Sequence, residues 1–424
     1  MFVLSVVIAM ILGYTGENTD IFCWMRIVNF YPFFYLGYVI SIEDITKWLE
    51  NKKIKVIVGL SGGVDSSVAL LKLKEQGYDV EAMYMRNWDS AINNDVLGNP
   101  DLMDEVCPQE RDYQDAKKVA HQLGIQLHRV DFIEEYWDSV FSFFLSEYKK
   151  NRTPNPDILC NKEIKFKTFL DKAIALGADY IAMGHYARVI HDGDKHYLLR
   201  GIDENKDQTY FLSQLSSAQL AKALFPIGDM LKPSVRELAR KYQLVVADKK
   251  DSTGVCFIGE RNFKEFLMNY IPATPGEIIS TDGRIVGHHD GVMYYTIGQR
   301  RGLHIGGPGE AWFVCGKDTT KNQLIVGQGK DTELLYANRV IVTDVNIING
   351  TFSNNQKMTA KFRYRQPDEE ITVSWVNENT LEVKCSRPVK AITPGQACVF
   401  YDGEYCLGGG TIDKVYMDNI LRKY

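Results

Sequence analysis

The sequence is poor in the residues that mark small secreted proteins and metal-binding proteins. Eight cysteines are spread over 424 residues, which is too few for a disulfide framework. No CxxC pair and no cluster of histidine and cysteine has the spacing of metal ligands, so we predict neither zinc nor an iron–sulfur cluster and assign no metal-binding residue. The cysteine content favours a reducing compartment, and we expect a cytoplasmic location.

A large excess of charge of either sign is also missing. The formal net charge is −5 and charged residues make up 24% of the chain, which is ordinary for a globular protein. Any surface that binds nucleic acid must therefore be local. The chain is too long for one typical core, so we expect two or three domains.

The sequence has no clean membrane-spanning run, although residues 1–51 differ from the rest. The stretch 1–14 is apolar but short, and the aromatic stretch 21–42 is interrupted by polar residues and Pro32. A membrane-associated helical hairpin is one interpretation. The other, which we favour, is a poorly packed extension from a misplaced start codon, without stable membrane association.

From Lys52 onward, strand and helix patterns alternate. Strands are expected over 53–60, 80–85, 127–132 and 180–183, with helices over 66–76, 111–123, 134–150 and 161–176. This alternation predicts an α/β fold, a doubly wound parallel sheet with helices on both faces, which we assign to residues 52–268. Ligands of such sheets bind at the carboxyl ends of the strands.

After about Tyr270 the pattern changes to short strands separated by turn dipeptides such as Asp282-Gly283 and Asp402-Gly403. It predicts antiparallel sheets or small barrels. Their spacing indicates two small β domains, a central one at residues 269–332 and a barrel-like one at residues 333–424.

The most informative segment is the junction Val56–Ser67, in which an apolar strand runs into a loop of small residues and then a helix. Such a junction directs free backbone N–H groups and the positive end of a helix dipole at an anion, usually phosphate. Gly62 and Gly63 allow close approach of the backbone. No lysine stands where the GxxxxGK[ST] loop of kinases and GTPases has one. The alternative is a glycine-rich turn that only packs a helix on a sheet.

The Ser-Gly-Gly-x-Asp-Ser pattern in this junction resembles the PP-loop of the ATP pyrophosphatase family. Those enzymes cut ATP between its α and β phosphates and attach AMP to an oxygen of their substrate. The resemblance implies adenylation, with ATP as cofactor and Mg²⁺ screening its phosphates.

A second candidate site contains Asn155-Pro156-Asp157 and Cys160. Its prolines are expected to exclude helix until just before Cys160, so that Asp157 and Cys160 lie near a helix start, where the dipole favours a thiolate. Basic residues also outnumber acidic ones over 149–167. The alternative is a small buried hydrophobe at Cys160 with Asp157 as a helix cap.

Cys256 lies next to Lys249 and Lys250 in a segment punctuated by glycine. Two cysteines in basic surroundings could meet in the fold and exchange a disulfide. The other six cysteines lack such surroundings, and packing or surface placement is expected for them.

Several motifs, in this order along the chain, resemble those of the tRNA-specific 2-thiouridylase family. They are the PP-loop, Asn155-Pro156-Asp157 with Cys160, Gly184-His185-Tyr186, Lys206-Asp207-Gln208, Ser252-Thr253-Gly254-Val255-Cys256, Gly298-Gln299-Arg300, Arg363-Tyr364-Arg365 and Thr393-Pro394-Gly395-Gln396. The resemblance covers roughly residues 52–416. It implies that ATP adenylates the C2 oxygen of the wobble uridine of certain tRNAs and that a protein persulfide then supplies sulfur.

The resemblance also implies roles for individual residues. Cys256 carries the persulfide, Cys160 releases its sulfur and ends disulfide-linked to Cys256, and Asp157 acts as acid and base. The implied nucleotide contacts are Gly59, Leu60, Ser61, Gly62, Gly63, Val64, Asp65, Ser66, Met85 and Gly184. The implied tRNA contacts are Asn155, Pro156, Asp157, His185, Lys206, Asp207, Gln208, Arg363, Tyr364 and Gln396. The partners that the resemblance implies are the anticodon loop of tRNA and a sulfur donor, either a cysteine desulfurase or a relay protein.

Some of these residues have simpler interpretations. Met85 could be part of the core. His185 could be a histidine at a strand end whose hydrogen bonds are made within the protein, and residues 206–208 could be a solvated turn. Over residues 357–365, period-two alternation places Lys357, Lys361, Arg363 and Arg365 on one strand face with no acid to balance them. We interpret this face as a contact for RNA phosphates, the alternative being a solvated strand face.

Three rival functions share some of these features. Another PP-loop enzyme, such as an amidotransferase-type synthetase or a tRNA lysidine synthetase, would not need Cys160 and Cys256. An RNA-binding module with a vestigial nucleotide site and a membrane sensor using the N-terminal segment are the other two.

Overall fold

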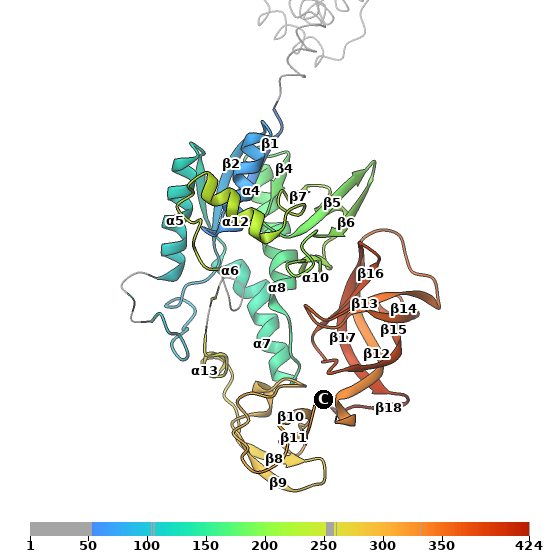
Figure 1. Cartoon of the computed structure of the whole chain (residues 1–424). Helices are drawn as coiled ribbons and strands as arrows, with labels where there is room; N and C mark the ends of the chain where they lie inside the picture. Colours follow the sequence, from blue (N-terminus) through green and yellow to red (C-terminus); the bar gives the residue numbers. More distant parts are fainter. Residues whose placement is uncertain are drawn as a thin grey trace, which may run out of the picture. The chain divides into compact units, whose positions relative to one another are not determined.

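The computed structural model describes residues 53–102, 104, 107–251, 258–259, 261–330 and 332–423. Residues 55–424 form one compact unit (Figure 1). The predictions for residues 1–51 and for Cys256 lie outside the described residues. Among the helices within the description, none combines the length and the apolar character needed to span a bilayer.

A five-stranded parallel sheet forms the first part of this unit. Its strand order is β3 (Leu127–Asp131), β2 (Asp79–Arg86), β1 (Lys55–Gly59), β4 (Tyr180–Ala182) and β7 (Ala223–Leu224). The chain winds outward from β1 in one direction through β2 and in the other through β4. The gap between the carboxyl ends of β1 and β4 is therefore the topological switch point, where such sheets bind ligands.

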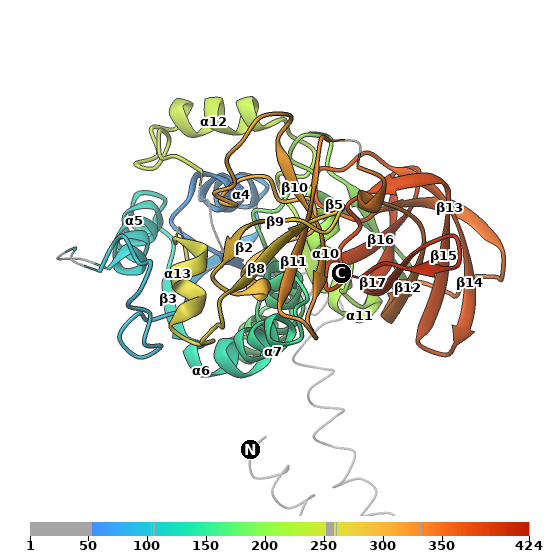
Figure 2. The ribbon, with the colours of Figure 1, turned by 90° about the horizontal axis from the view of Figure 1, so that it is seen from below.

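Both faces of this sheet are buried, which confirms the doubly wound arrangement. Val56 and Val58 of β1 face one hydrophobic cluster, and Ile57 between them faces another. The first face is covered by α4 (Val64–Glu75), α5 (Pro108–Gln122) and α12 (Lys232–Lys241). The second is covered by helices between residues 133 and 175, so that the sheet lies between two helical layers (Figure 2).

The helices on the second face come in two runs. The first run is α6 (Ile133–Tyr136), the π-helical η1 (Trp137–Phe141) and α7 (Ser142–Lys149). The second is α8 (Pro156–Leu159), the π-helical η2 (Cys160–Thr168) and α9 (Phe169–Ala175). Both predicted helices are confirmed, but the second begins at Pro156 rather than just before Cys160. Proline is well suited to a first helical position because its fixed φ matches the helix and its missing N–H would be unpaired there.

The shorter helices and the 3-10 turns lie in the connections. They are α10 (Thr209–Leu212), α11 (Ser217–Leu220), α13 (Phe263–Met268), η3 (Val292–Tyr294) and η4 (Glu333–Leu335).

A β-hairpin that the sequence analysis did not predict leaves the α/β part. It consists of β5 (Ala187–Asp192) and β6 (Lys195–Arg200), joined by a turn in which Gly193 has φ +57°. Strand β6 pairs with β17 (Tyr405–Met417) of the C-terminal barrel. The Asp192-Gly193 dipeptide between two strand-like stretches is the signal that could have revealed the hairpin.

The central β domain contains a four-stranded sheet in the order β10 (Trp312–Asp318), β11 (Gln323–Gln328), β8 (Gly276–Ser280) and β9 (Ile285–His289). Two of its pairings are antiparallel, as expected, but β11 runs parallel to β8. The sheet is therefore mixed, which local strand patterns do not reveal because they carry no information on strand direction.

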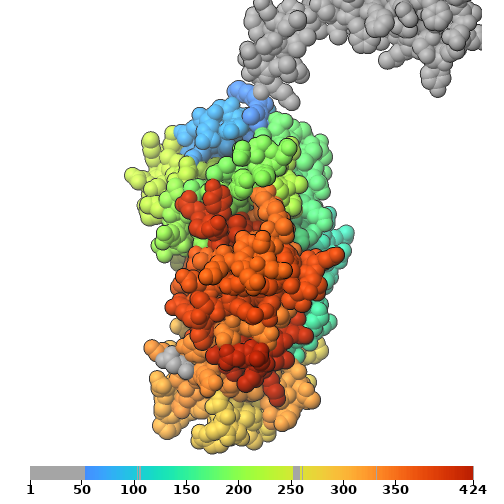
Figure 3. Space-filling view, turned by 90° about the vertical axis from the view of Figure 1, so that its right-hand side faces the viewer, coloured from blue at the N-terminus to red at the C-terminus, as the bar shows by residue number. Residues whose placement is uncertain are grey.

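The C-terminal strands form a barrel. Its order is β12 (Tyr336–Ile347), β15 (Thr380–Lys390), β14 (Glu369–Asn377), β13 (Gln356–Lys361), β16 (Ala397–Asp402) and β17, and pairing between β12 and β17 closes it. The short β18 (Ile420–Leu421) pairs with β17. Figure 3 shows the barrel, in orange and red, forming much of one face of the unit below green residues of the α/β part. The predicted β character of this part is confirmed.

The predicted four-cation strand face is wrong. Strand β13 ends at Lys361 and the next residues form a turn, so the two arginines at 363 and 365 do not continue the strand. Period-two alternation holds only while the chain stays extended. An acid is also present, because Asp368 Oδ1 lies 3.8 Å from Lys361 Nζ.

Candidate active site

The loop between β1 and α4 is closed by its own hydroxyl groups. Ser61 N donates to Ser66 Oγ over 3.2 Å, and Ser66 Oγ donates to Gly63 O over 3.2 Å. The N-cap residue of α4 is Gly63, and no side chain caps the helix. The first N–H groups of α4 and the positive end of its dipole are thus left for an anion at the switch point.

Two glycines make this arrangement possible. Gly62 has φ +75°, and a Cβ there would lie 2.1 Å from Asp112 O. A Cβ at Gly184, which follows β4, would lie 2.7 Å from Ser66 N. The structure therefore brings Gly184 against the start of α4, as expected for two parts of one binding site.

Met85 is 7% exposed and belongs to the core cluster that contains Ile57. Its packing role is thus established, and its contact with a nucleotide stays a prediction.

Beside the loop lies a lysine that sequence reasoning missed. Lys232 is 8% exposed, and its Nζ lies 2.8 Å from both carboxylate oxygens of Asp65 and 2.8 Å from Asp251 Oδ1. Tyr186 Oη also donates to Asp65 Oδ1, over 2.7 Å. A lysine at the first position of a helix, where the dipole disfavours a cation, is the local signal that could have singled it out.

A second lysine reaches the loop from the segment that leads to Cys256. Lys249 Nζ donates to Gly62 O over 3.0 Å and to Asp112 and Asp115 over 2.8 Å each. Burial alone would lower the pKa of Lys249, but the two carboxylates outweigh burial and raise it. The amine therefore stays charged beside the loop.

Asp251 links Lys232 to Lys206, a predicted tRNA contact. Lys206 Nζ donates to Asp251 Oδ2 over 2.8 Å, and Arg236 Nη2 donates to Asp251 Oδ1 over 2.7 Å. Burial would raise the pKa of Asp251, but hydrogen bonds from Lys206 and Lys232 lower it far below its usual range. The carboxylate is thus a permanently ionised centre among cations.

The other two residues of this motif are not a solvated turn. Asp207 is 6% exposed and accepts hydrogen bonds from Gly201 N and from the hydroxyl of Thr209. Gln208 Oε1 accepts from Tyr186 N over 2.9 Å. Gln208 therefore supports the strand end that carries Gly184 and His185, whereas Asp207 holds Gly201 and Thr209.

The second predicted site lies at the start of α8. Asn155 is its N-cap residue, and its Oδ1 accepts a hydrogen bond from Asp157 N over 3.1 Å. Asp157 is half-buried, and Cys160 is fully buried at the first position of η2. Because the helix begins at Pro156, Cys160 lies a full turn inside it, so the dipole acts on this thiol less than expected.

Contacts connect the helix of Cys160 with the nucleotide loop. The ring of Phe166 in η2 lies 6.1 Å from that of His185, the residue after Gly184. His185 is 8% exposed, and burial followed by the charge of Lys165 holds its pKa well below the usual value, so the ring is neutral. Within the described residues its Nδ1 has no hydrogen-bond partner. Its contact with tRNA stays a prediction.

The barrel holds the chain just before α8. Thr153 N donates to Pro394 O over 2.9 Å, and Gln396 Nε2 donates to Thr153 O over 2.7 Å. Arg152 is paired with Glu147 Oε2 at 2.7 Å and with Asp413 Oδ1 of β17 at 2.6 Å. Gln396, a predicted tRNA contact, is thus brought directly to the candidate catalytic loop.

A pocket of about 330 Å³ opens at this junction. It is lined by Thr296, Ile297, Gly298, Gln299, Arg363 and Gln396. The guanidinium of Arg363 points inward, because its Nη2 donates to Ile297 O over 2.7 Å and to Thr393 Oγ1 over 2.9 Å. Arg363 therefore joins the barrel to the central domain, and burial lowers its pKa.

Tyr364 also faces the α/β part. Its ring centroid lies 4.4 Å from that of Phe211, whose carbonyl accepts a hydrogen bond from Asn161, the residue after Cys160. The turn that contains Arg363 and Tyr364 is thus near the candidate catalytic helix.

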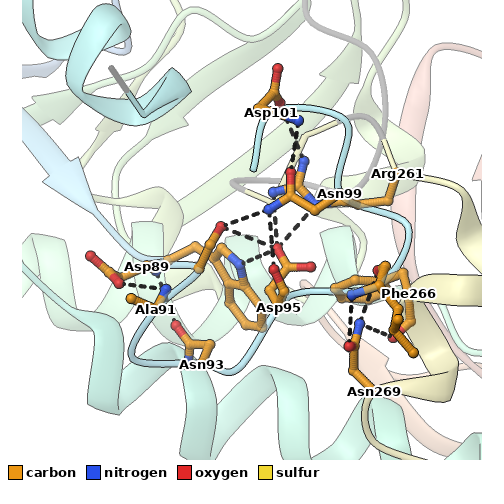
Figure 4. A network of polar contacts seen from close by, with 12 residues as sticks. Asp89, Ala91, Asn93, Asp95, Asn99, Asp101, Arg261, Phe266 and Asn269 are labelled. Atoms are coloured by element: carbon orange, nitrogen blue, oxygen red, sulfur yellow. Dashed lines mark hydrogen bonds and ion pairs between the residues drawn. The ribbon is translucent and has the colours of Figure 1, made fainter. Parts of the chain in front are cut away.

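A buried ion pair lies a few residues after Cys256 in the sequence. Arg261 Nε and Nη2 lie 3.0 Å and 2.9 Å from Asp95 Oδ2, which also accepts from Trp88 Nε1 over 3.0 Å. Figure 4 shows how the connection between β2 and α5 folds around this pair, with Asn99 and Asp101 beside Arg261. A carboxylate that is 0% exposed requires such partners.

Comparison with known proteins agrees with this geometry. Family models match three consecutive parts: a tRNA methyl transferase HUP domain over residues 54–260, a tRNA methyl transferase PRC-barrel domain over 264–328 and an aminomethyltransferase beta-barrel domain over 337–412. The tRNA-specific 2-thiouridylase MnmA of Acholeplasma laidlawii is 56% identical over 375 residues, 88% of this chain and 100% of the relative. Its counterpart in Bacillus cytotoxicus is 56% identical over 363 residues, 85% of this chain and 95% of the relative.

The chain belongs to the tRNA-specific 2-thiouridylase family. The resemblance drawn from the sequence is therefore confirmed. Solved structures give a weaker likeness: a 4-thiouridine synthetase–RNA complex with bound ATP aligns over 49% of this chain and 45% of its own, with 13% identity and a TM-score of 0.30.

The geometry accounts for many of the motifs that placed the chain in the 2-thiouridylase family. The PP-loop and Gly184 touch, the His185 strand end contacts the Cys160 helix, and Gln396 reaches the loop before Asn155. The predicted meeting of Cys160 and Cys256 stays a prediction, because Cys256 lies outside the described residues.

Proposed function

We propose that this chain is an ATP-dependent tRNA-uridine 2-sulfurtransferase that converts the wobble uridine of tRNA to 2-thiouridine, with release of AMP and pyrophosphate. The observation that carries the proposal is 56% identity along the whole length of a tRNA-specific 2-thiouridylase. Support comes from the contact between the Gly184 strand end, which packs on the nucleotide loop, and the helix of Cys160.

The nucleotide loop has the properties that ATP requires. The uncapped N-terminus of α4 offers N–H groups to phosphate, and glycine at 184 leaves the approach open. Lys232 and Lys249 supply the positive charge that a kinase-type loop carries in its own lysine. Asp65 offers the carboxylate oxygens that Mg²⁺ prefers. ATP would supply the adenylyl group that turns the C2 oxygen of uracil into a good leaving group.

The two cysteines and Asp157 would perform the second step. The terminal sulfur of a Cys256 persulfide adds to C2 of the activated uridine and displaces AMP. The Cys160 thiolate then attacks the Cys256 sulfur, which breaks the sulfur–sulfur bond and leaves 2-thiouridine and a Cys160–Cys256 disulfide. Asp157, half-buried one turn before Cys160, would accept and return the proton that these steps exchange. A thiol reductant would restore both cysteines.

The partners follow from this chemistry. The target base must leave its stack to reach a buried thiol, which costs least in a single-stranded anticodon loop. We propose that residues 52–268 carry both chemical steps and that the β domains, 269–332 and 333–424, hold the tRNA through Arg363, Tyr364 and Gln396. A cysteine desulfurase or a sulfur-relay protein would load the persulfide.

Incubation with ATP, Mg²⁺, a persulfide source and tRNA tests the proposal, with mass spectrometry of the anticodon-loop uridine as the readout. We expect 2-thiouridine that depends on ATP. Release of pyrophosphate with tRNA but without any thiouridine would contradict the sulfur-transfer step and favour another PP-loop enzyme. Absence of both products would favour a non-catalytic RNA-binding module.

A further inference from the structure

A buried lysine of the central β domain has no place in the mechanism above. Lys317 lies in β10, where the residues from 314 to 317 are all buried, and it is 4% exposed. Within the described residues no carboxylate lies within 4.0 Å of its amine, whereas other buried cations such as Lys232 and Arg261 have one. A buried charge without a counter-charge destabilises a fold, so its retention needs a reason.

Both polar ends of Lys317 are held by the backbone of other segments. Its Nζ donates to Asn151 O over 2.9 Å, and its own N donates to Lys423 O over 2.9 Å. Burial lowers the pKa of the amine to about 7. The amine thus makes a long-range hydrogen bond with the α/β part of the chain.

Asn151 is where α7 ends. It has φ +62°, its N donates to Tyr148 O over 2.9 Å, and Arg152 N donates to Glu147 O over 3.0 Å. These two bonds form a Schellman motif with Asn151 in the left-handed position. The carbonyl of Asn151 lies at the negative end of the α7 dipole, which favours a cation there.

The direction of the chain at Asn151 decides where the candidate catalytic residues lie. Four residues further on, Asn155 caps α8, and α8 carries Asp157 and leads into Cys160. The barrel fixes the middle of this loop through Gln396 and Asp413, and Lys317 fixes its beginning from the central domain.

We propose that Lys317 is a positioning residue for sulfur transfer, a buried amine that fixes the start of the catalytic loop and so orients Asp157 and Cys160. The inference rests on the proposed thiolation activity. It gives the central β domain a role in the chemical step in addition to any contact with tRNA.

The test compares Lys317→Met with Lys321→Met, a matched control at an exposed lysine between β10 and β11. Methionine has a similar volume and no charge. We expect Lys317→Met to fold with an unchanged or higher Tm and to bind ATP and tRNA with wild-type Kd values. We expect its kcat for thiolation to fall by about 10- to 100-fold, because small displacements of reacting groups have effects of that size. The control keeps the wild-type rate.

Hydrogen exchange supplies a second readout. A positioning role predicts faster amide exchange only at the start of the catalytic loop, whereas a general loss of stability would speed exchange throughout the fold. In Lys317→Met we expect faster exchange of the amides of residues 151–153 and 155 and unchanged exchange in the nucleotide loop. A wild-type kcat in Lys317→Met overturns the inference. A lower Tm with a parallel loss of ATP and tRNA affinity also overturns it, because that result indicates general damage. Failure of the wild-type protein to thiolate tRNA would refute the proposed function instead, so the two failures are distinguishable.

Discussion

The nucleotide loop at 59–66 and the candidate catalytic loop at 151–160 are held by different parts of the molecule. Lys232, Lys249 and Tyr186 hold the nucleotide loop, and all three belong to the α/β part. The catalytic loop is held by Lys317 of the central domain and by Gln396 and Asp413 of the barrel.

This difference separates two requirements. The nucleotide loop needs only the α/β part, so ATP binding should tolerate damage to the β domains. The candidate catalytic loop is held by residues of three domains at once. We therefore expect sulfur transfer to be sensitive to damage in the β domains. Coupling the loop to the domains that are proposed to bind tRNA would make the chemical step sensitive to correct docking of the RNA.

The largest effect is expected for Cys160→Ser, because serine cannot form the disulfide by which the proposed mechanism releases sulfur. We expect thiolation to fall by at least about 1,000-fold while the Kd for ATP stays unchanged. Mass spectrometry of the tRNA and a nucleotide-binding titration measure the two quantities. The control is Cys107→Ser at an exposed, free cysteine. Full activity of Cys160→Ser would show that sulfur transfer does not depend on Cys160.

The substitution Lys232→Met tests the nucleotide loop. Loss of the proposed charge-assisted contact with phosphate should weaken ATP binding by about 10- to 100-fold, and thiolation should fall in parallel when ATP is limiting. The control is Lys72→Met, which removes another lysine–aspartate pair of 2.8 Å, with Asp229, away from the loop. Wild-type ATP affinity in Lys232→Met would contradict the role assigned to this lysine.

Gln396→Ala tests the hold of the barrel on the catalytic loop. The variant loses the bond to Thr153 O, and we expect kcat for thiolation to fall by about 3- to 10-fold at unchanged ATP affinity. The matched control is Gln214→Ala, because Gln214 Nε2 also donates to a barrel carbonyl, Gly409 O at 2.9 Å, but at a different place. An effect on the Kd for tRNA alone would indicate an RNA contact in place of a positioning role.

The smallest effect concerns pH. Burial lowers the pKa of Lys317 from 10.5 to about 7, so between these values the unfolded chain binds more protons than the folded chain. The free energy of unfolding contributed by this group therefore rises with pH across that window. We expect the Tm of the wild type to rise relative to Lys317→Met by about 2–4 °C between pH 7 and pH 10. A difference that is constant over this range would indicate a lysine that stays charged.

The α/β part was largely predictable because its signals are local. Strand β1, the glycine-rich loop and helix α4 follow one another within twenty-one residues, and each is indicated by the residues that form it. The helix start at Pro156 and the hairpin β5–β6 have local signals as well, a proline at a first helical position and an Asp-Gly turn.

The errors occurred where a local pattern stopped being valid. Arg363 continues the alternation of β13 in the sequence, but the strand ends at Lys361 and the arginine turns toward Ile297 and Thr393. No periodicity in the sequence reports where a strand ends against another domain.

The sequence by itself determined the family of this protein, through a glycine-rich strand–loop–helix junction and an order of motifs typical of the 2-thiouridylases. Each of these motifs is a contiguous stretch of the chain, so short-range geometry and propensity specify it. The tertiary structure decided which distant residues contact these motifs. Lys232 reaches Asp65 from 167 positions away and Lys317 reaches Asn151 from 166. Contacts at that separation arise from packing of whole elements, which no local pattern encodes.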